Sequence, residues 1–132
     1  MKSKAMMPVK KITPVLLADR VEPCIDFWGK LGFEKTMDVP AGDHLAFAVV
    51  KKDSIELMYQ TYASVEQEPG GPKNFARGPT FLYVEVDNLE ETKRAVAGAK
   101  IAMQERTTFY GSKEFGVEDP AGHLVTFAQF GG

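Results

Sequence analysis

The sequence has few of the features that mark several large classes of protein. Its single cysteine, Cys24, excludes an intramolecular disulfide and a multi-cysteine zinc cluster. Its longest apolar run, Leu45–Val50, is far shorter than the roughly 20 residues that a membrane-spanning helix needs. The basic start, MKSKAMMPVKK, lacks the apolar stretch of a secretory signal. These absences favour a cytoplasmic protein without a membrane partner.

The sequence also lacks a large excess of basic or acidic residues. Lys and Arg number 16 against 18 Asp and Glu, which gives a formal net charge of −2. Proteins that bind the phosphate backbone usually carry a basic excess, so we expect no nucleic-acid partner. The 132 residues are 44% hydrophobic and 26% charged, which is typical of one globular domain.

Two passages about half a chain apart share one pattern. Residues 13–28 read TPVLLADRVEPCIDFW, and residues 81–96 read FLYVEVDNLEETKRAV. An offset of 68 residues places Asp19 on Asp87. In both passages an apolar run of strand length leads into a helix-like stretch, which indicates an internal duplication.

The two helix-like stretches have matching start and stop residues. We predict that the aspartate of each passage is the N-cap. Glu22 and Glu90 follow three residues later, where a capping-box acid reaches back. Each helix is predicted to end before a glycine in a left-handed turn, Gly32 in the first passage and Gly98 in the second.

Three strands are predicted after each helix. They are Phe33–Val39, His44–Lys51 and Ser54–Tyr62 in the first half, and Ala99–Tyr110, Lys113–Glu118 and His123–Phe130 in the second. The order βαβββ therefore occurs twice, which predicts an α+β fold of two tandem modules in one domain. The modules span about 10–62 and 79–130, with a connector at 63–78 that contains Pro69 and Pro72.

The sequence resembles the vicinal oxygen chelate superfamily, which includes glyoxalase I, bleomycin resistance proteins and extradiol dioxygenases. IDFWGKLGF at 25–33 resembles its helix-to-strand junction; FLYVEVDNLEE at 81–91 and EFGVEDPAGHLVTF at 114–127 resemble its second module. The resemblance extends over most of the chain and is closest in type to the metal-free, bleomycin-resistance-like members. It implies two βαβββ units forming a curved mixed sheet around a cavity, in a homodimer.

The resemblance also implies where a metal site would lie. Metal-dependent members hold a divalent ion with His, Gln or Glu side chains from the first and last strands of each module. The matching positions here are Thr13, Glu56, Phe81 and Thr126. Only Glu56 carries a suitable donor, since phenylalanine cannot coordinate and neutral hydroxyls are poor substitutes. We therefore expect no metal and no cofactor, and the sequence favours a protein that is not an enzyme.

The two histidines do not change this expectation. His44 is predicted to have a partly exposed structural role at the start of a strand. His123 follows the DPAG turn and is predicted to be a surface or turn-bonding residue.

Strand alternation places Phe81, Tyr83 and Glu85 on the side of the sheet that faces the hollow. The first module contributes Thr13, Val15, Leu17, Glu56 and Met58 to a mostly apolar lining of the kind that binds small molecules. An aromatic pair before the seventh strand is a candidate for stacking on a planar ligand. The predicted ligand-binding residues are Glu56, Met58, Phe81, Tyr83, Phe109 and Tyr110.

Each of these residues also has a structural alternative. Phe81 and Tyr83 can fill the interior, and Phe109 and Tyr110 can pack in a dimer interface. Glu56 can pair with a Lys or Arg, contact a ligand, or act as a general base; in the last case burial would raise its pKa toward neutrality.

Three functions compete. The leading one is a metal-independent binding protein that sequesters a planar or amphipathic toxic compound or antibiotic. The second is a glyoxalase-like lyase, isomerase or dioxygenase with a non-standard metal site or Glu56 as base. The third is a non-catalytic dimeric interaction domain.

Overall fold

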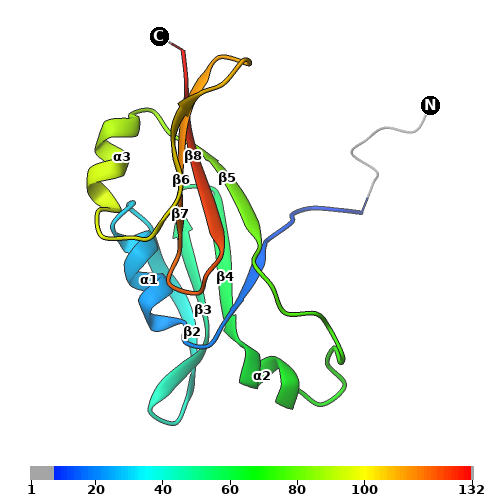
Figure 1. Ribbon diagram of the computed structural model, residues 1–132. Helices are drawn as coiled ribbons and strands as arrows, with labels where there is room; N and C mark the ends of the chain where they lie inside the picture. The colour runs from blue at the N-terminus through cyan, green and yellow to red at the C-terminus, as the bar shows by residue number, and fades with distance from the viewer. Residues whose placement is uncertain (1–7, 132) are drawn as a thin grey trace, which may run out of the picture.

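The computed structural model describes residues 8–131, which form two βαβββ modules (Figure 1). The first module comprises β1 (Val15–Ala18), α1 (Glu22–Gly29), β2 (Glu34–Ala41), β3 (His44–Lys52) and β4 (Ile55–Thr61). The second comprises β5 (Phe81–Glu85), α3 (Leu89–Ala95), β6 (Ile101–Thr107), β7 (Ser112–Glu118) and β8 (Leu124–Phe130). A short helix, α2 (Tyr62–Gln67), follows β4. Most of the basic N-terminal stretch lies outside the described residues.

Each module forms its own four-stranded mixed sheet. The strand orders are β1-β4-β3-β2 and β5-β8-β7-β6, with β1 parallel to β4 and β5 parallel to β8. The remaining neighbours pair antiparallel. The predicted α+β fold and its duplication are therefore confirmed. No helix within residues 8–131 is long and apolar enough to cross a membrane.

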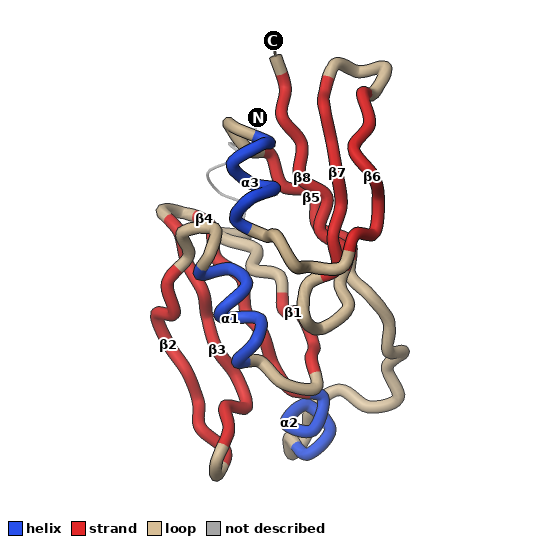
Figure 2. The backbone as a smooth tube through the Cα atoms, turned by 60° about the vertical axis from the view of Figure 1, so that its left-hand side comes forward, coloured by secondary structure: helices blue, strands red, loops and turns tan. Residues whose placement is uncertain are grey.

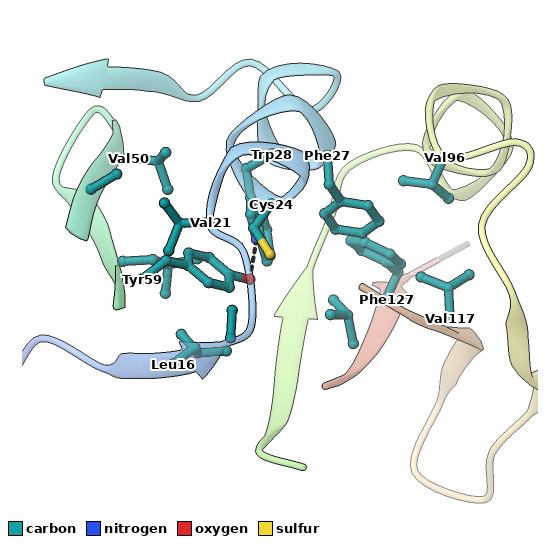
Figure 3. Close-up of a cluster of buried hydrophobic side chains, with 14 of the residues drawn as sticks. Leu16, Val21, Cys24, Phe27, Trp28, Val50, Tyr59, Val96, Val117 and Phe127 are labelled. Atoms are coloured by element: carbon teal, nitrogen blue, oxygen red, sulfur yellow. Dashed lines mark hydrogen bonds between the residues drawn. The ribbon is translucent and has the colours of Figure 1, made fainter. Parts of the chain in front are cut away.

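The two long helices cover one side of the sheets, α1 on the first and α3 on the second (Figures 1 and 2). Alternating strand residues supply the buried layer beneath them, as Ala48 and Val50 do on β3. One cluster spans both modules (Figure 3). It consists of Leu16, Ala18, Val21, Cys24, Phe27, Trp28, Ala48, Val50, Leu57, Tyr59, Leu89, Val96, Phe115, Val117, Val125 and Phe127.

Polar bonds inside this layer tie the modules together. The indole Nε1 of Trp28 donates to the Tyr59 hydroxyl at 2.7 Å. That hydroxyl donates in turn to Oδ2 of Asp119 in the second module, at 2.6 Å. His123 is also buried, so the prediction of a surface position for it is wrong.

The predicted helix caps are partly wrong. Val21 is the N-cap of α1 and makes no side-chain cap bond, because valine has no acceptor. The Glu22 carboxylate, predicted to reach back to the cap, instead accepts from the backbone N–H of Leu45 at 2.7 Å. The N-cap of α3 is Asn88, whose side chain accepts from Glu91 N–H at 3.0 Å. This position is one residue beyond the predicted aspartate. The glycines after the helices do have positive φ, +92° and +96°, as predicted.

Two strand ends differ from the prediction for local reasons. The strand predicted to end at Tyr62 ends at Thr61, whose hydroxyl accepts from Ser64 N–H at 3.1 Å and caps α2. The strand predicted to end at Tyr110 ends at Thr107. The next residues form the β6–β7 turn, where Gly111 has a φ of +95°.

Candidate functional site

The second sheet has an open face on the side away from α3. Phe115 and Val117 of β7 point into the core, so Ser112, Glu114 and Gly116 point the other way. Strand register places the remaining residues of this face. They are Phe81, Tyr83 and Glu85 on β5, Thr126, Ala128 and Phe130 on β8, and Met103 and Arg106 on β6.

Glu114 lies at the centre of this face and is completely buried. Its Oε2 accepts hydrogen bonds from the Tyr110 hydroxyl at 2.8 Å and the Ser112 hydroxyl at 2.9 Å, and from the Tyr83 hydroxyl. Its Oε1 accepts from Nη2 of Arg106 at 3.1 Å. A carboxylate offers about four lone-pair sites, so these four donors satisfy it.

These contacts fix the charge state of the cluster. Burial raises the pKa of a carboxyl group, but the hydrogen bonds from Tyr83, Tyr110 and Ser112 outweigh burial and lower the pKa of Glu114 to about 2. The bond to Glu114 also raises the pKa of Tyr83 to about 12. At neutral pH the carboxylate is therefore ionised and Tyr83 remains a donor.

Aromatic rings surround the buried carboxylate. Tyr110 packs edge-on against Phe109, with ring centroids 5.1 Å apart, and its ring lies 6.4 Å from that of Phe130. Tyr83 and Tyr110 expose about half of their surface although their hydroxyls are held, and Phe109 is fully exposed. The arrangement presents ring surfaces to solvent in fixed positions, which suits stacking on a planar molecule.

The predicted site residues thus divide between the two sheets. Tyr83 and Tyr110 meet at Glu114, and Phe109 packs on Tyr110. Phe81 lies at the start of β5 and is 73% exposed. Glu56 and Met58 lie on β4 of the first sheet.

Glu56 has a partner of opposite charge. Its Oε1 lies 2.7 Å from Nζ of Lys11, and its side chain is only 15% exposed. Lys11 lowers the pKa of Glu56, with smaller contributions from Lys51 across the strand pair and from the Thr13 hydroxyl. The shift is opposite in direction to that of a carboxyl group tuned as a general base near neutrality.

The residues at the four positions where the resemblance implies metal ligands do not fit a divalent ion. Thr13 lies just before β1 and its hydroxyl contacts Glu56 on β4, but the carboxylate is paired with Lys11. In the second sheet Phe81 has no donor atom, and Thr126 pairs with Tyr83. Within residues 8–131, no three His, Cys, Asp or Glu side chains are grouped so as to hold a metal.

A cleft of about 560 Å³ runs along the free edge of β5, between the modules. Tyr83 and Glu85 line it from the second module, and Trp28, Phe33 and Leu57 from the first. It therefore begins at the edge of the open face and reaches the core beneath α1.

Sequence reasoning missed Glu114 and Arg106. Alternation along β7 does place Glu114 opposite the buried Phe115, so its position on the hollow side could have been inferred. Its burial could not, because it depends on Tyr83, 31 residues away, and on Arg106 across the hairpin.

Comparison with known proteins identifies the fold and family. The chain is similar to TioX from Micromonospora sp. ML1 (TM-score 0.73, 19% identity, 92% of this chain and 98% of that one). It is also similar to a lactoylglutathione lyase from Agrobacterium tumefaciens, with a TM-score of 0.71 and 19% identity over 92% of this chain and 95% of that one. A glyoxalase-related enzyme from Fulvimarina pelagi is similar too, with a TM-score of 0.71 and 17% identity over 92% of this chain and 88% of that one. No curated protein matched the sequence.

The family assignment comes from the sequence itself. The model of the Glyoxalase/Bleomycin resistance protein/Dioxygenase superfamily matches residues 11–127, nearly the whole of both modules. The duplicated βαβββ architecture agrees with this match. The chain therefore belongs to the Glyoxalase/Bleomycin resistance protein/Dioxygenase superfamily.

Proposed function

We propose that this protein is a metal-independent small-molecule-binding protein that sequesters a planar or amphipathic compound such as an antibiotic. The observation that carries the proposal is the open face of the second sheet, where the buried Glu114 fixes Tyr83 and Tyr110. Held rings lose little conformational entropy when a ligand stacks on them, so the face is preorganised for binding.

The four family metal positions support binding over metal-dependent catalysis. Glu56 is their one carboxylate, and Lys11 neutralises it. The same ion pair also disfavours Glu56 as a metal-free base, because a general base works best with a pKa near the operating pH.

A second copy of the chain is the proposed cover for the two open faces. The first sheet exposes Val15, Met37 and Val39 on the side away from α1, and the second exposes Phe81 and Phe130 on the side away from α3. Apolar surface of this extent commonly marks an interaction site. A twofold dimer in which unlike sheets face each other would enclose a ligand between them.

The direct test is thermal unfolding with and without a panel of planar aromatic antibiotics, glycopeptides and quinones. A ligand present at 100 times its Kd adds about 2.7 kcal/mol to the free energy of unfolding. We expect at least one compound to raise Tm, with the same increase after exhaustive dialysis against EDTA. The Tyr110→Ala variant should lose this increase. Tyr62→Ala, which alters a tyrosine of α2, is the matched control.

Two results would contradict the proposal. Stoichiometric divalent metal in the purified protein, with activity lost on chelation, would establish the enzymatic alternative. A panel without any stabilising compound, together with loss of host function on substitution at the dimer surface, would favour a non-catalytic interaction domain.

A further inference from the structure

Two charged residues on the open face of the second sheet, Glu114 and Arg106, differ in their exposure to solvent. Glu114 is fully buried and has four donors, so its carboxylate makes no direct contact with a ligand. The side chain of Arg106, its ion-pair partner, is 56% exposed. A guanidinium has five N–H donors, and the structure places one on Glu114, so further donors face solvent.

The other exposed charge on this face lies at the opposite edge of the sheet. Glu85 is on β5 and Arg106 is on β6, which are the two edge strands in the order β5-β8-β7-β6. Three strand spacings of about 4.8 Å separate the backbones of the two residues by roughly 14 Å. This exceeds the Debye length of about 8 Å at physiological ionic strength, so Glu85 has little influence at Arg106.

The donors and the rings converge on one carboxylate. Arg106 binds Oε1 of Glu114, while Tyr83 and Tyr110 bind Oε2. The cationic group therefore lies next to the aromatic surfaces. A ligand that stacks on these rings places a ring substituent within reach of the guanidinium. Arginine forms its strongest hydrogen bonds with carboxylate and similar anionic oxygens.

We propose that this face binds a planar aromatic compound that carries an acidic group, with its rings against Tyr83 and Tyr110 and its acid on Arg106. This inference rests on the proposed binding function and specifies the chemistry of the ligand. Arg106 is then the residue that selects for charge, and Glu114 is a positioning residue that fixes both the guanidinium and the rings.

Three naphthalenes of one shape test the inference by calorimetric titration. They are 2-naphthoate, 2-naphthalenemethanol and 2-naphthylmethylamine, which are anionic, neutral and cationic at neutral pH. We expect the wild-type protein to bind 2-naphthoate about tenfold more tightly than the alcohol, which is the lower end of the net gain from one hydrogen bond between charged groups, and the amine most weakly.

Variants at Arg106 assign the preference to the guanidinium. Arg106→Gln should remove the preference for 2-naphthoate over the alcohol, because the guanidinium that binds the acid is absent. Arg106→Lys retains the charge and should restore part of the preference. Arg94→Gln, on the exposed surface of α3, is the matched control and should retain all of it.

The outcomes separate this inference from the proposed function. Equal binding of the anion and the alcohol, or a preference that survives Arg106→Gln, overturns the inference and leaves the binding function standing. Absence of binding by all three probes overturns the inference as well, and the antibiotic panel then decides the proposed function independently.

Discussion

The imidazole of His123 donates a hydrogen bond from Nε2 to the backbone carbonyl of Leu17, at 2.7 Å. The proton is on Nε2 because Nδ1 accepts from the backbone N–H of Thr80 at 2.8 Å. Leu17 belongs to β1 of the first module, and His123 directly precedes β8 of the second. One neutral side chain therefore joins the two halves of the duplication.

Loss of this imidazole should destabilise the whole chain. His123→Ala leaves the Leu17 carbonyl and the Thr80 N–H without this partner, so we expect the free energy of unfolding to fall by about 2–4 kcal/mol. Urea denaturation followed by circular dichroism measures the change. His44→Ala, at a half-exposed histidine, should alter it by less than about 0.5 kcal/mol. A similar effect of both substitutions would contradict the assigned role.

The buried Tyr59 hydroxyl makes a second link between the modules. Tyr59→Phe removes the acceptor for Trp28 Nε1 and the donor to Asp119, and we expect a loss of about 2 kcal/mol in the free energy of unfolding. Denaturation by urea again provides the measurement. Tyr62→Phe is the control, since Tyr62 lies on α2, outside this network. An unchanged midpoint in Tyr59→Phe would show that the hydroxyl contributes nothing net.

Glu114 should give a specific acid dependence of stability. Its pKa is lowered from 4.5 to about 2 by the hydrogen bonds of the cluster, so it stabilises the fold above the unfolded-state pKa. Glu114→Gln should cost about 2–3 kcal/mol at pH 7. The difference from wild type should stay constant down to about pH 5 and then shrink as the pH falls toward about 2.

Urea titrations at several pH values check this prediction. Glu118→Gln is the matched control on the same strand, because Glu118 forms a more exposed ion pair with Lys100. It should change the free energy of unfolding by less than about 1 kcal/mol. A Glu114→Gln difference that is independent of pH between 7 and 2 would refute the assigned charge state.

The proposed dimer can be tested at two residues of equal exposure. Met37 and Ile55 are both 54% exposed, but Met37 lies on the open face of the first sheet and Ile55 on the side of the core. Met37→Asp should shift the protein toward monomer in sedimentation velocity, because it places a charge in the proposed interface. Ile55→Asp should leave the distribution unchanged. A monomeric wild-type protein would exclude the dimer.

The fold could be predicted because its determinants are local and occur twice. Apolar runs, the Asp-containing junctions and the glycines at 32 and 98 recur at a constant offset, and the structure has a strand or helix at each expected place. The N-cap of α3 lies one residue beyond the prediction because the Asn88 side chain accepts from Glu91 N–H. In α1 the predicted capping acid Glu22 instead bonds to Leu45, in a strand that follows the helix. That contact exists only once the module has folded.

The candidate site was predicted only in part. Alternation and composition indicated Tyr83 and Tyr110, but neither pattern shows that both hydroxyls converge on Glu114. Glu56 was predicted to be a site residue because the resemblance implies a metal ligand at that position. Its pairing with Lys11 depends on where the segment before β1 lies. Packing decides which residues interact across strands and between distant segments. A single sequence does not show which residues are packed together.

The most exposed apolar side chains on the open faces of the two sheets differ, since Val15, Met37 and Val39 are aliphatic and Phe81, Tyr83 and Phe130 are aromatic. When two copies related by a twofold axis lie with unlike sheets face to face, they form two equivalent chambers. Each chamber then has one wall from either chain, and no chamber lies on the symmetry axis. The proposed dimer would therefore bind one ligand molecule per chain, and each ligand would contact different residues of the two chains.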